Sequence, residues 1–192
     1  MQFCNCKCKK FSPQKCTLNN VQQFFRCYCD FGILAWGGVN ASKLQKIVKI
    51  QKKCVRNVAG KGHRAHTDPL FSMLNILKFP DLFKLNCSLF MHKYSNKKVP
   101  PSFEAFFTKM AAPNRTKGFI TEKLVKTSYE QFPNYFLPKI WNDNAQPLKS
   151  IESHSSFKDK LYASLISQYP PSFKCKVRSC PDCYPPVIYL GR

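Results

Sequence analysis

Residues Phe31 to Tyr94 read FGILAWGGVNASKLQKIVKIQKKCVRNVAGKGHRAHTDPLFSMLNILKFPDLFKLNCSLFMHKY. An aromatic, glycine-bearing turn is followed by a basic segment, a His-Thr-Asp-Pro sequence and a second, more apolar segment. In both segments apolar residues recur three and four positions apart, which is the spacing of one face of an α-helix. The stretch therefore predicts a small helical bundle. For the whole chain we expect a mainly α fold, with short irregular or β segments in the second half and loosely ordered termini.

The basic segment is predicted to form an amphipathic helix over residues 44–58, with Asn40 or Ser42 as its N-cap and Gly60 just past its end. At about 100° of rotation per residue, its apolar side chains fall within one arc of roughly 120°. That arc holds Leu44, Ile47, Val48, Cys54, Val55 and Val58. The opposite side carries Lys43, Lys46, Lys49, Lys52, Lys53 and Arg56, with Ile50 at the edge.

A helix is also predicted before the basic segment. Apolar residues over 18–35 recur with helical spacing, and this helix runs into Gly32 or as far as Ala35. The pair Gly37-Gly38 then forms a turn, because two glycines stop a helix and allow positive φ.

Two further helices are predicted after it, and a last one near the end. Asp68 is expected to cap a short helix that begins at Pro69, and Pro80 to open a long, largely buried helix. Ser155 or Ser156 is expected to cap the last helix. Its inward residues are Phe157, Leu161, Leu165 and Ile166, and its outward residues are Lys158 and Lys160.

The helical pattern is interrupted in the second half, where short strands are expected near Gly118–Ile120 and Leu124–Lys126. We expect three segments along the chain. They are a poorly ordered Cys- and Lys-rich leader (1–17), a helical domain (18–169) and a Pro/Cys-rich tail (170–192).

The charge is strongly basic and uneven. The 192 residues carry 31 Lys and Arg against 10 Asp and Glu, a formal charge of +21. Residues 40–67 contain no acid at all. Such an excess predicts attraction to polyanions rather than a particular fold. No apolar stretch is long enough for a membrane span, and the first residues lack a secretory signal, so we expect a protein of the nucleus or cytoplasm with no membrane partner.

The basic helix face is the strongest candidate for a binding surface. A solvated helix face usually mixes charges of both signs in i,i+4 pairs, and this one does not. A phosphate partner, RNA or DNA, would offset the mutual repulsion, although a merely solvated face remains the alternative. The predicted nucleic-acid-binding residues are Lys43, Lys46, Lys49, Lys52, Lys53, Arg56, Lys61 and Arg64.

Cysteines supply the candidate metal ligands. Cys175, Cys180 and Cys183 could give three thiolates to Zn²⁺, but a structural zinc site needs four ligands, and the nearest histidine is His154. Free thiols are the favoured alternative, because the 11 cysteines belong to a chain with no secretion signal. The triplet Cys4, Cys6 and Cys8 is a weaker candidate still.

Histidines and tryptophans favour structural roles. His63 and His66 flank Arg64 without an evident nucleophile or acid partner, so no catalytic residue is predicted and His66 is expected to bond the backbone of the following turn. Trp36 and Trp141 are expected to anchor the core or a turn rather than to stack on bases.

The order of these motifs resembles the region that follows the catalytic palm in reverse transcriptases of non-LTR retrotransposons, the jockey-like group especially. The resemblance covers about residues 18–170 and is specific between 31 and 94. It rests on Phe31-Gly32, Trp36-Gly37, the lysine-rich helix, Ala65–Phe71 (AHTDPLF), Leu74–Phe79 (LNILKF), Phe90–Tyr94 (FMHKY), Trp141-Asn142 and Phe157-Lys158 with Leu161. A downstream Leu-Pro pair of the family is changed here to Gln146-Pro147-Leu148.

The resemblance implies a parent RNA-directed DNA polymerase whose Mg²⁺ ions are held by adjacent aspartates. This chain has no Asp-Asp pair. We therefore expect a non-catalytic C-terminal fragment that needs no cofactor and binds nucleic acid. The alternative is an interaction module, or a degenerate relic, that packs on a missing palm-and-fingers portion and has no activity alone.

Overall fold

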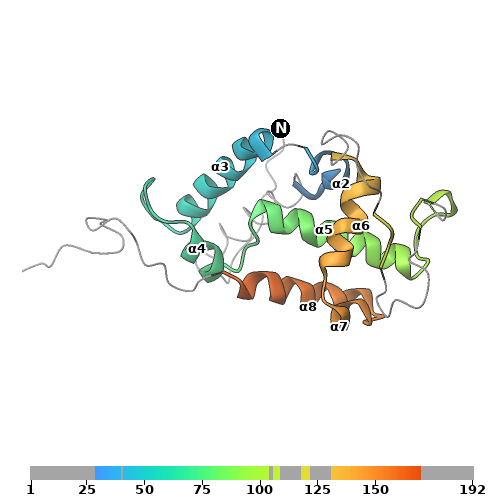
Figure 1. Ribbon diagram of the computed structural model, residues 1–192. Coiled ribbons are helices and arrows are strands. Elements are labelled where there is room, and N and C mark those ends of the chain that lie inside the picture. Colours follow the sequence, from blue (N-terminus) through green and yellow to red (C-terminus); the bar gives the residue numbers. More distant parts are fainter. Residues whose placement is uncertain (1–28, 40, 104–105, 109–117, 122–130, 170–192) are drawn as a thin grey trace, which may run out of the picture.

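The computed structural model describes residues 29–39, 41–103, 106–108, 118–121 and 131–169. These ranges are mainly helical, which confirms the predicted fold class (Figure 1). The elements are α2 (Ile33–Trp36), α3 (Ala41–Val58), α4 (Asp68–Met73), α5 (Phe79–Ser95), a 3-10 turn (Pro101–Phe103), α6 (Pro133–Asp143), α7 (Gln146–Lys149) and α8 (His154–Ser167). The expected leader and tail, the strand near 124–126 and Asn40 lie outside the described residues.

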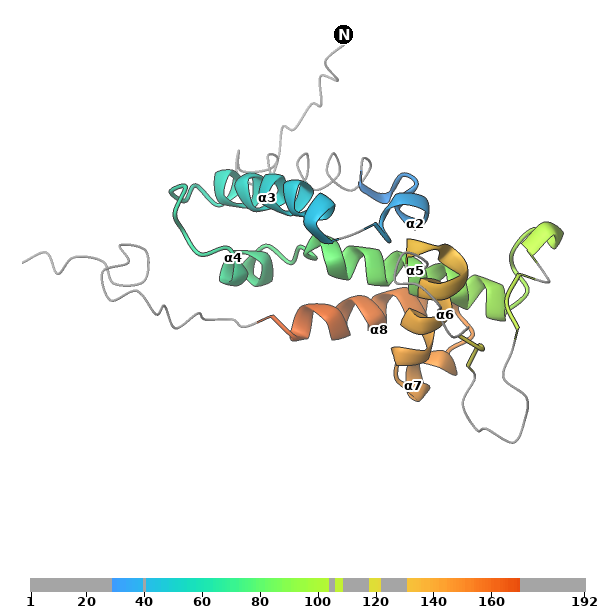
Figure 2. The ribbon, with the colours of Figure 1, turned by 45° about the horizontal axis from the view of Figure 1, so that its top comes forward.

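Helix α5 is the centre of the bundle. It contacts α2, α3, α6 and α8, and Figure 2 shows it lying between α3 on one side and α8 on the other. Because it is covered on several sides, its apolar residues are not confined to one stripe. Its buried residues are Phe79, Leu82, Leu85, Cys87, Ser88, Met91, His92 and Tyr94, which confirms the prediction of a largely buried helix opened by Pro80.

Three helices end in the same way, with one residue in the left-handed conformation. Gly60 follows α3 with φ +63°, Asn75 follows α4 with φ +52°, and Lys97 follows α5 with φ +55°. After α3 the N–H of Lys61 donates to the carbonyl of Arg56 at 3.0 Å, and the N–H of Gly60 to that of Asn57 at 3.1 Å. These two bonds satisfy carbonyls that the helix leaves unpaired. The prediction for Gly60 is confirmed.

Gly32, Gly37 and Gly38 shape the chain on either side of α2. Cys29 and Asp30 are helical, the chain turns at Phe31 and Gly32, and Gly32 has φ +64°. The preceding helical residues therefore do not continue to Ala35, which lies in the separate short helix α2. The predicted turn at Gly37 and Gly38 is confirmed, but it does not use the positive φ that glycine allows, since Gly37 has φ −70°. A Cβ on Gly37 would lie 2.5 Å from the ring of Phe83, and one on Gly38 2.6 Å from the ring of Phe136.

Two predicted caps lie one to three residues from their true positions. Thr67, not Asp68, is the N-cap of α4, and Asp68 is its first helical residue. Ser153, rather than Ser155 or Ser156, caps α8, because its Oγ accepts a hydrogen bond from the N–H of Ser156 at 3.5 Å. Ser42 lies inside the first turn of α3 and is not its N-cap.

Helices α6 and α7 were not predicted. Pro138 lies inside α6, where a proline normally argues against a helix because it has no N–H to donate. The helix forms because its buried face packs on α5. That face consists of Phe136, Leu137, Pro138 and Trp141.

The expected strand near Gly118–Ile120 is reduced to a single bridge in the described part of the chain. The N–H of Ile120 donates to the carbonyl of Thr108 at 2.8 Å. The Asn142 side chain binds both backbone groups of Phe119, accepting from its N–H at 3.0 Å and donating to its carbonyl at 2.8 Å. Trp141 beside it is 1% exposed. Trp141 therefore anchors the core, as predicted, and Asn142 beside it holds the backbone of Phe119.

Candidate nucleic-acid interface

A buried glutamine fixes the orientation of α3. Gln51 is 2% exposed, and its Nε2 donates to the carbonyl of Leu77 at 2.8 Å. Its Oε1 accepts from the N–H of Phe79 at 2.9 Å. These two bonds satisfy backbone groups where the chain enters α5, so rotating α3 would leave buried polar groups unpaired. The apolar periodicity of the sequence does not single out Gln51, although this residue lies at the middle of the apolar arc at 100° per residue.

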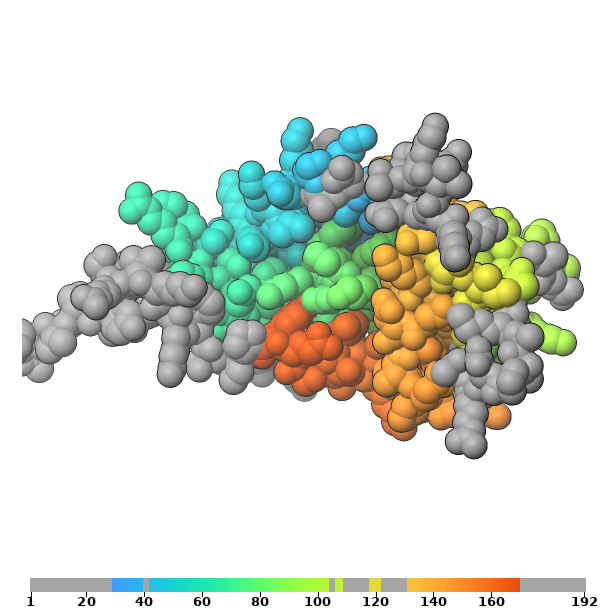
Figure 3. Space-filling model, in the orientation of Figure 1, coloured from blue at the N-terminus to red at the C-terminus, as the bar shows by residue number. Residues whose placement is uncertain are grey.

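With Gln51 and Val55 turned inward, the lysine face of α3 points away from the core. Lys43, Lys46, Lys49 and Lys53 are exposed, and Lys52 and Arg56 are half-buried. The predicted apolar arc is confirmed as the side of α3 that packs on the core. Val55 is buried, and Leu44, Ile47 and Val48 pack against the core. The other two members, Cys54 and Val58, are half-buried. Figure 3 shows α3, in blue to cyan, along the upper edge of the molecular surface.

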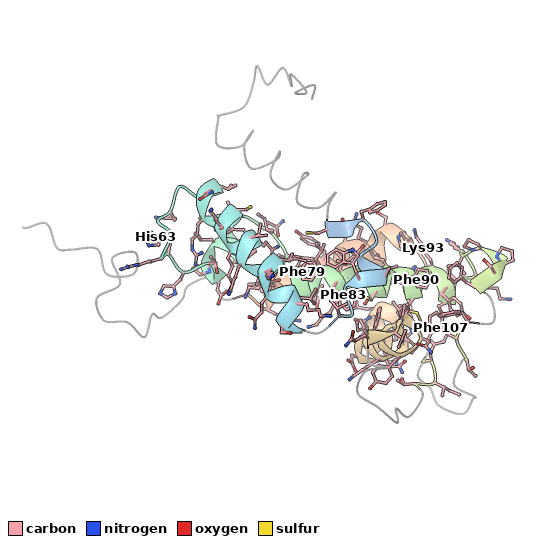
Figure 4. All side chains as sticks on the ribbon, turned by 90° about the horizontal axis from the view of Figure 1, so that it is seen from above. His63, Phe79, Phe83, Phe90, Lys93 and Phe107 are labelled. Atoms are coloured by element: carbon pink, nitrogen blue, oxygen red, sulfur yellow. The ribbon has the colours of Figure 1, made fainter. Side chains whose placement is uncertain are left out.

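Arg56 also has a structural role. Its Nε donates to the carbonyl of Ala65 at 2.7 Å, and Ala65 is 2% exposed. This bond ties the end of α3 to the loop that carries Lys61, His63 and Arg64, all of which are exposed. Figure 4 shows His63 at the end of the molecule away from Lys93 and Phe107. The loop therefore extends the cationic surface beyond the end of the helix.

Two of the described acids, Asp68 and Asp81, pair with lysines outside α3. Lys78 pairs with Asp68 at 3.0 Å, and Lys84 pairs with Asp81 at 3.5 Å. Asp81 also accepts a hydrogen bond from the Tyr169 hydroxyl at 2.5 Å. Burial, and then this bond, raise the pKa of that tyrosine. Within the described ranges, none of the α3 lysines lies within 4.0 Å of a carboxylate. We call the group of Lys43, Lys46, Lys49, Lys52, Lys53, Arg56, Lys61 and Arg64 the basic surface.

The predicted metal ligands and the predicted role of His66 are not tested by the described residues. Cys175, Cys180 and Cys183 lie outside the described residues, as do Cys4, Cys6 and Cys8. Among described residues no group of three or more His, Cys, Asp or Glu could hold a metal ion. Cys29, Cys54 and Cys87 are free thiols, and burial raises the pKa of Cys29 to about 11. The bond expected from His66 to the turn backbone stays a prediction.

Trp36 is a turn anchor, as predicted. Its Nε1 donates to the carbonyl of Phe31 at 3.0 Å, and its ring stacks on Phe79 with centroids 5.5 Å apart. The indole thus joins the turn before α3 to the start of α5 and is not free to stack on a base.

None of the helices in the described segments combines the length and apolar character that crossing a membrane requires. Comparison of the chain with protein-family models, with curated proteins and with solved structures finds no match.

Proposed function

We propose that the chain binds nucleic acid through phosphate contacts made by the basic surface. The observation that carries the proposal is the row of exposed ammonium groups on α3, which no described carboxylate neutralises. Holding like charges together costs free energy, and a strand of phosphates offsets that cost by releasing its condensed counterions. Contacts of this kind position a strand without reading its sequence.

The length of α3 suits a run of phosphates. Its 18 residues extend about 27 Å, whereas successive phosphates of one duplex strand are about 3.4 Å apart along the axis. Lys46, Lys49 and Lys53 are spaced by three and four residues, so they form one row. The helix can therefore contact several phosphates at once as a rigid rod, because Gln51 and Arg56 fix it at two points.

We further propose that the chain is a non-catalytic C-terminal part of a non-LTR retrotransposon reverse transcriptase. The resemblance of residues 31–94 supports this proposal, and so does the structural use of its motif residues, such as Trp141-Asn142 around Phe119. The sequence has no adjacent aspartates, so the Mg²⁺-dependent chemistry would reside in a palm portion that these residues do not include.

The affinity for a labelled RNA or DNA oligonucleotide tests the binding proposal. The α3 variant carries Lys46→Gln, Lys49→Gln and Lys53→Gln, and leaves Arg56 intact because that side chain holds the loop. The control variant carries Lys84→Gln, Lys139→Gln and Lys160→Gln, which removes the same charge from exposed positions on other helices. Near 0.1 M salt we expect the α3 variant to lose on the order of 100-fold in affinity, through three lost phosphate contacts.

Equal affinity of the α3 variant and the wild type in a mobility-shift assay would contradict the proposal. Equal losses in the α3 and control variants would mean that total charge, and not the basic surface, governs binding. Circular dichroism of each variant checks that the helices remain folded.

A second candidate function is docking on another polymerase portion. Large apolar side chains that lie on the surface and not in the core favour this candidate. Phe31 is 85% exposed, Met73 65% and Ile50 58%. Exposed apolar groups of this size are typical of interfaces when they gather in one patch. Absence of any RNA or DNA binding by the purified wild-type chain would leave this candidate in place of the first.

A further inference from the structure

Two exposed phenylalanines lie on the chain that follows α5. Phe103 ends the 3-10 turn and is 37% exposed, and Phe106 is 50% exposed. The N–H of Phe106 donates to the carbonyl of Phe103 at 3.0 Å, and the two rings meet edge to face with centroids 6.1 Å apart. Single exposed apolar side chains are ordinary, whereas apolar side chains that gather on the surface indicate an interaction site. We call Phe103 and Phe106 the aromatic pair.

The core holds the aromatic pair in place. The ring of Phe103 packs on Phe90 of α5, with centroids 5.9 Å apart, and the ring of Phe106 packs on the buried Phe107 at 4.9 Å. The Tyr94 hydroxyl ties Phe107 to α5, because it accepts from the N–H of Phe107 at 3.1 Å and donates to its carbonyl at 3.2 Å. Since the rings are already positioned, binding to them loses little conformational entropy.

The sequence around the aromatic pair is strongly basic. Residues 93–120 contain six cations and one acid, Glu104. The cations are Lys93, Lys97, Lys98, Lys109, Arg115 and Lys117. The last three and Glu104 lie outside the described residues. A surface with exposed rings and an excess of positive charge fits a partner that is both apolar and anionic.

Three of the cations are described, and the backbone places them at the end of α5. Lys93 is three residues after Phe90, so it lies one helical turn from the ring on which Phe103 packs. The N–H of Lys98 donates to the carbonyl of Lys93 at 2.8 Å, which folds the chain back over the last turn of the helix. Lys93, Lys97 and Lys98 are exposed, and none of them lies within 4.0 Å of a described carboxylate.

We propose that the aromatic pair binds single-stranded nucleic acid by stacking on its bases, while Lys93, Lys97 and Lys98 attract its phosphates. Aromatic rings within a cationic surface are the arrangement by which proteins hold single strands, because each base has a flat apolar face and each nucleotide a negative charge. A partner protein with an apolar surface would cover the rings but leave the ammonium groups without an anion.

The spacing of the rings favours a single strand over a duplex. Bases in a duplex are paired and stacked about 3.4 Å apart, so no base face within it is open to a side chain. The ring centroids of the aromatic pair are 6.1 Å apart, which suits neighbouring bases of a strand stretched until they no longer stack on each other.

The aromatic pair is separate from the basic surface. Figure 4 shows Phe90, Lys93 and Phe107 towards one end of the molecule and His63 at the other. The inference therefore goes beyond the proposed role of α3 and does not depend on it.

The test compares two labelled oligonucleotides by fluorescence anisotropy with the full chain. One is an oligothymidylate of about twelve nucleotides, and the other is an abasic strand of the same length. Both carry the same phosphates, so the ratio of their affinities measures what the bases contribute. We expect the wild type to bind the oligothymidylate more tightly by on the order of tenfold, which is typical of a base stacked on an aromatic ring.

Variants assign this ratio to the aromatic pair. Phe103→Leu with Phe106→Leu keeps apolar side chains but removes the rings, so the ratio should fall to near unity. Phe103→Tyr with Phe106→Tyr keeps the rings and should keep the wild-type ratio. The matched control is Phe31→Leu with Phe132→Leu, which removes two exposed rings before α2 and α6 and should also keep the ratio. Circular dichroism checks that each variant is folded.

Equal affinities of the wild type for the two strands would overturn the proposal. The wild-type ratio in the Phe103→Leu, Phe106→Leu variant would also overturn it and would leave the exposed rings to docking on a protein. The α3 variant should bind both strands more weakly and keep the ratio. Failure of the basic surface and failure of the aromatic pair are therefore distinguishable results.

Discussion

At the scale of single residues, polar side chains inside the bundle fix positions that apolar packing leaves adjustable. Gln51 is the clearest case, because it lies in the middle of an apolar arc and binds two backbone groups of another segment. Asn142 does the same for Phe119. Apolar periodicity predicts the arc but gives no role to a glutamine within it, because the partners of that side chain lie 26 and 28 residues away in the sequence.

Replacing Gln51 with Leu should destabilise the protein. The carbonyl of Leu77 and the N–H of Phe79 would be buried without partners, at a cost of about 1–3 kcal/mol each, partly offset by the added apolar burial. Urea unfolding measures the free energy, with exposed Gln45→Leu on the same helix as the control. A Gln51→Leu protein as stable as the control would show that the two bonds do not hold α3.

The positions of helix caps are also only partly predictable from local sequence. A cap was predicted at Asp68 because Asp precedes Pro69, yet the helix begins one residue earlier and Thr67 occupies the cap. Asp68 instead pairs with Lys78 at 3.0 Å. The pairing partner follows from how α4 meets α5, which local sequence does not encode. Helix ends are uncertain by a residue or two for this reason.

At the scale of elements, strong apolar periodicity was sufficient to predict a helix, and weak periodicity was not. Helices α3 and α8 were predicted with their inward faces, and α5 as a largely buried helix, because each repeats apolar residues at three and four positions. Helix α6 was missed because Pro138 breaks the local pattern, although Pro133 lies in its first turn, where proline is favoured. Its end is stabilised by Lys149, whose Nζ donates to the carbonyl of Asn142 at 2.9 Å.

The ends of α3 and α5 give a paired prediction. Both residues Gly60 and Lys97 adopt left-handed φ, which costs a residue with a Cβ about 1 kcal/mol. Lys97→Gly should therefore raise the free energy of unfolding by about 0.5–1 kcal/mol, and Gly60→Ala should lower it by about 1 kcal/mol. Thermal unfolding of the two variants measures both shifts. A loss of stability in Lys97→Gly would contradict the assigned conformation.

At the scale of the whole molecule, the distribution of charge matters more than its total. The formal charge of +21 could be read from the composition, and the absence of acids over 40–67 from the sequence. Neither the composition nor the sequence shows where the acids of other segments lie after folding. Asp68 and Asp81 pair with Lys78, Lys84 and Tyr169, around the start of α5. The basic surface gains no neutralising partner from them.

One revision to the basic surface also comes at this scale. Arg56 was predicted as a phosphate ligand from its position in the helix, and it donates to Ala65 on the following loop. Its contribution is then partly to hold Lys61 and Arg64 in place. This is why the α3 variant leaves it unchanged.

The salt dependence of binding to a DNA duplex tests the central claim most directly. If about five cations of the basic surface contact phosphates, they contribute about −4.5 to the slope of log K against log salt concentration. The α3 variant should then have a slope shallower by about 2.7 than the wild type, while the control variant keeps the wild-type slope. Identical slopes for the wild type and the α3 variant would contradict the claim that the outer face of α3 binds phosphates.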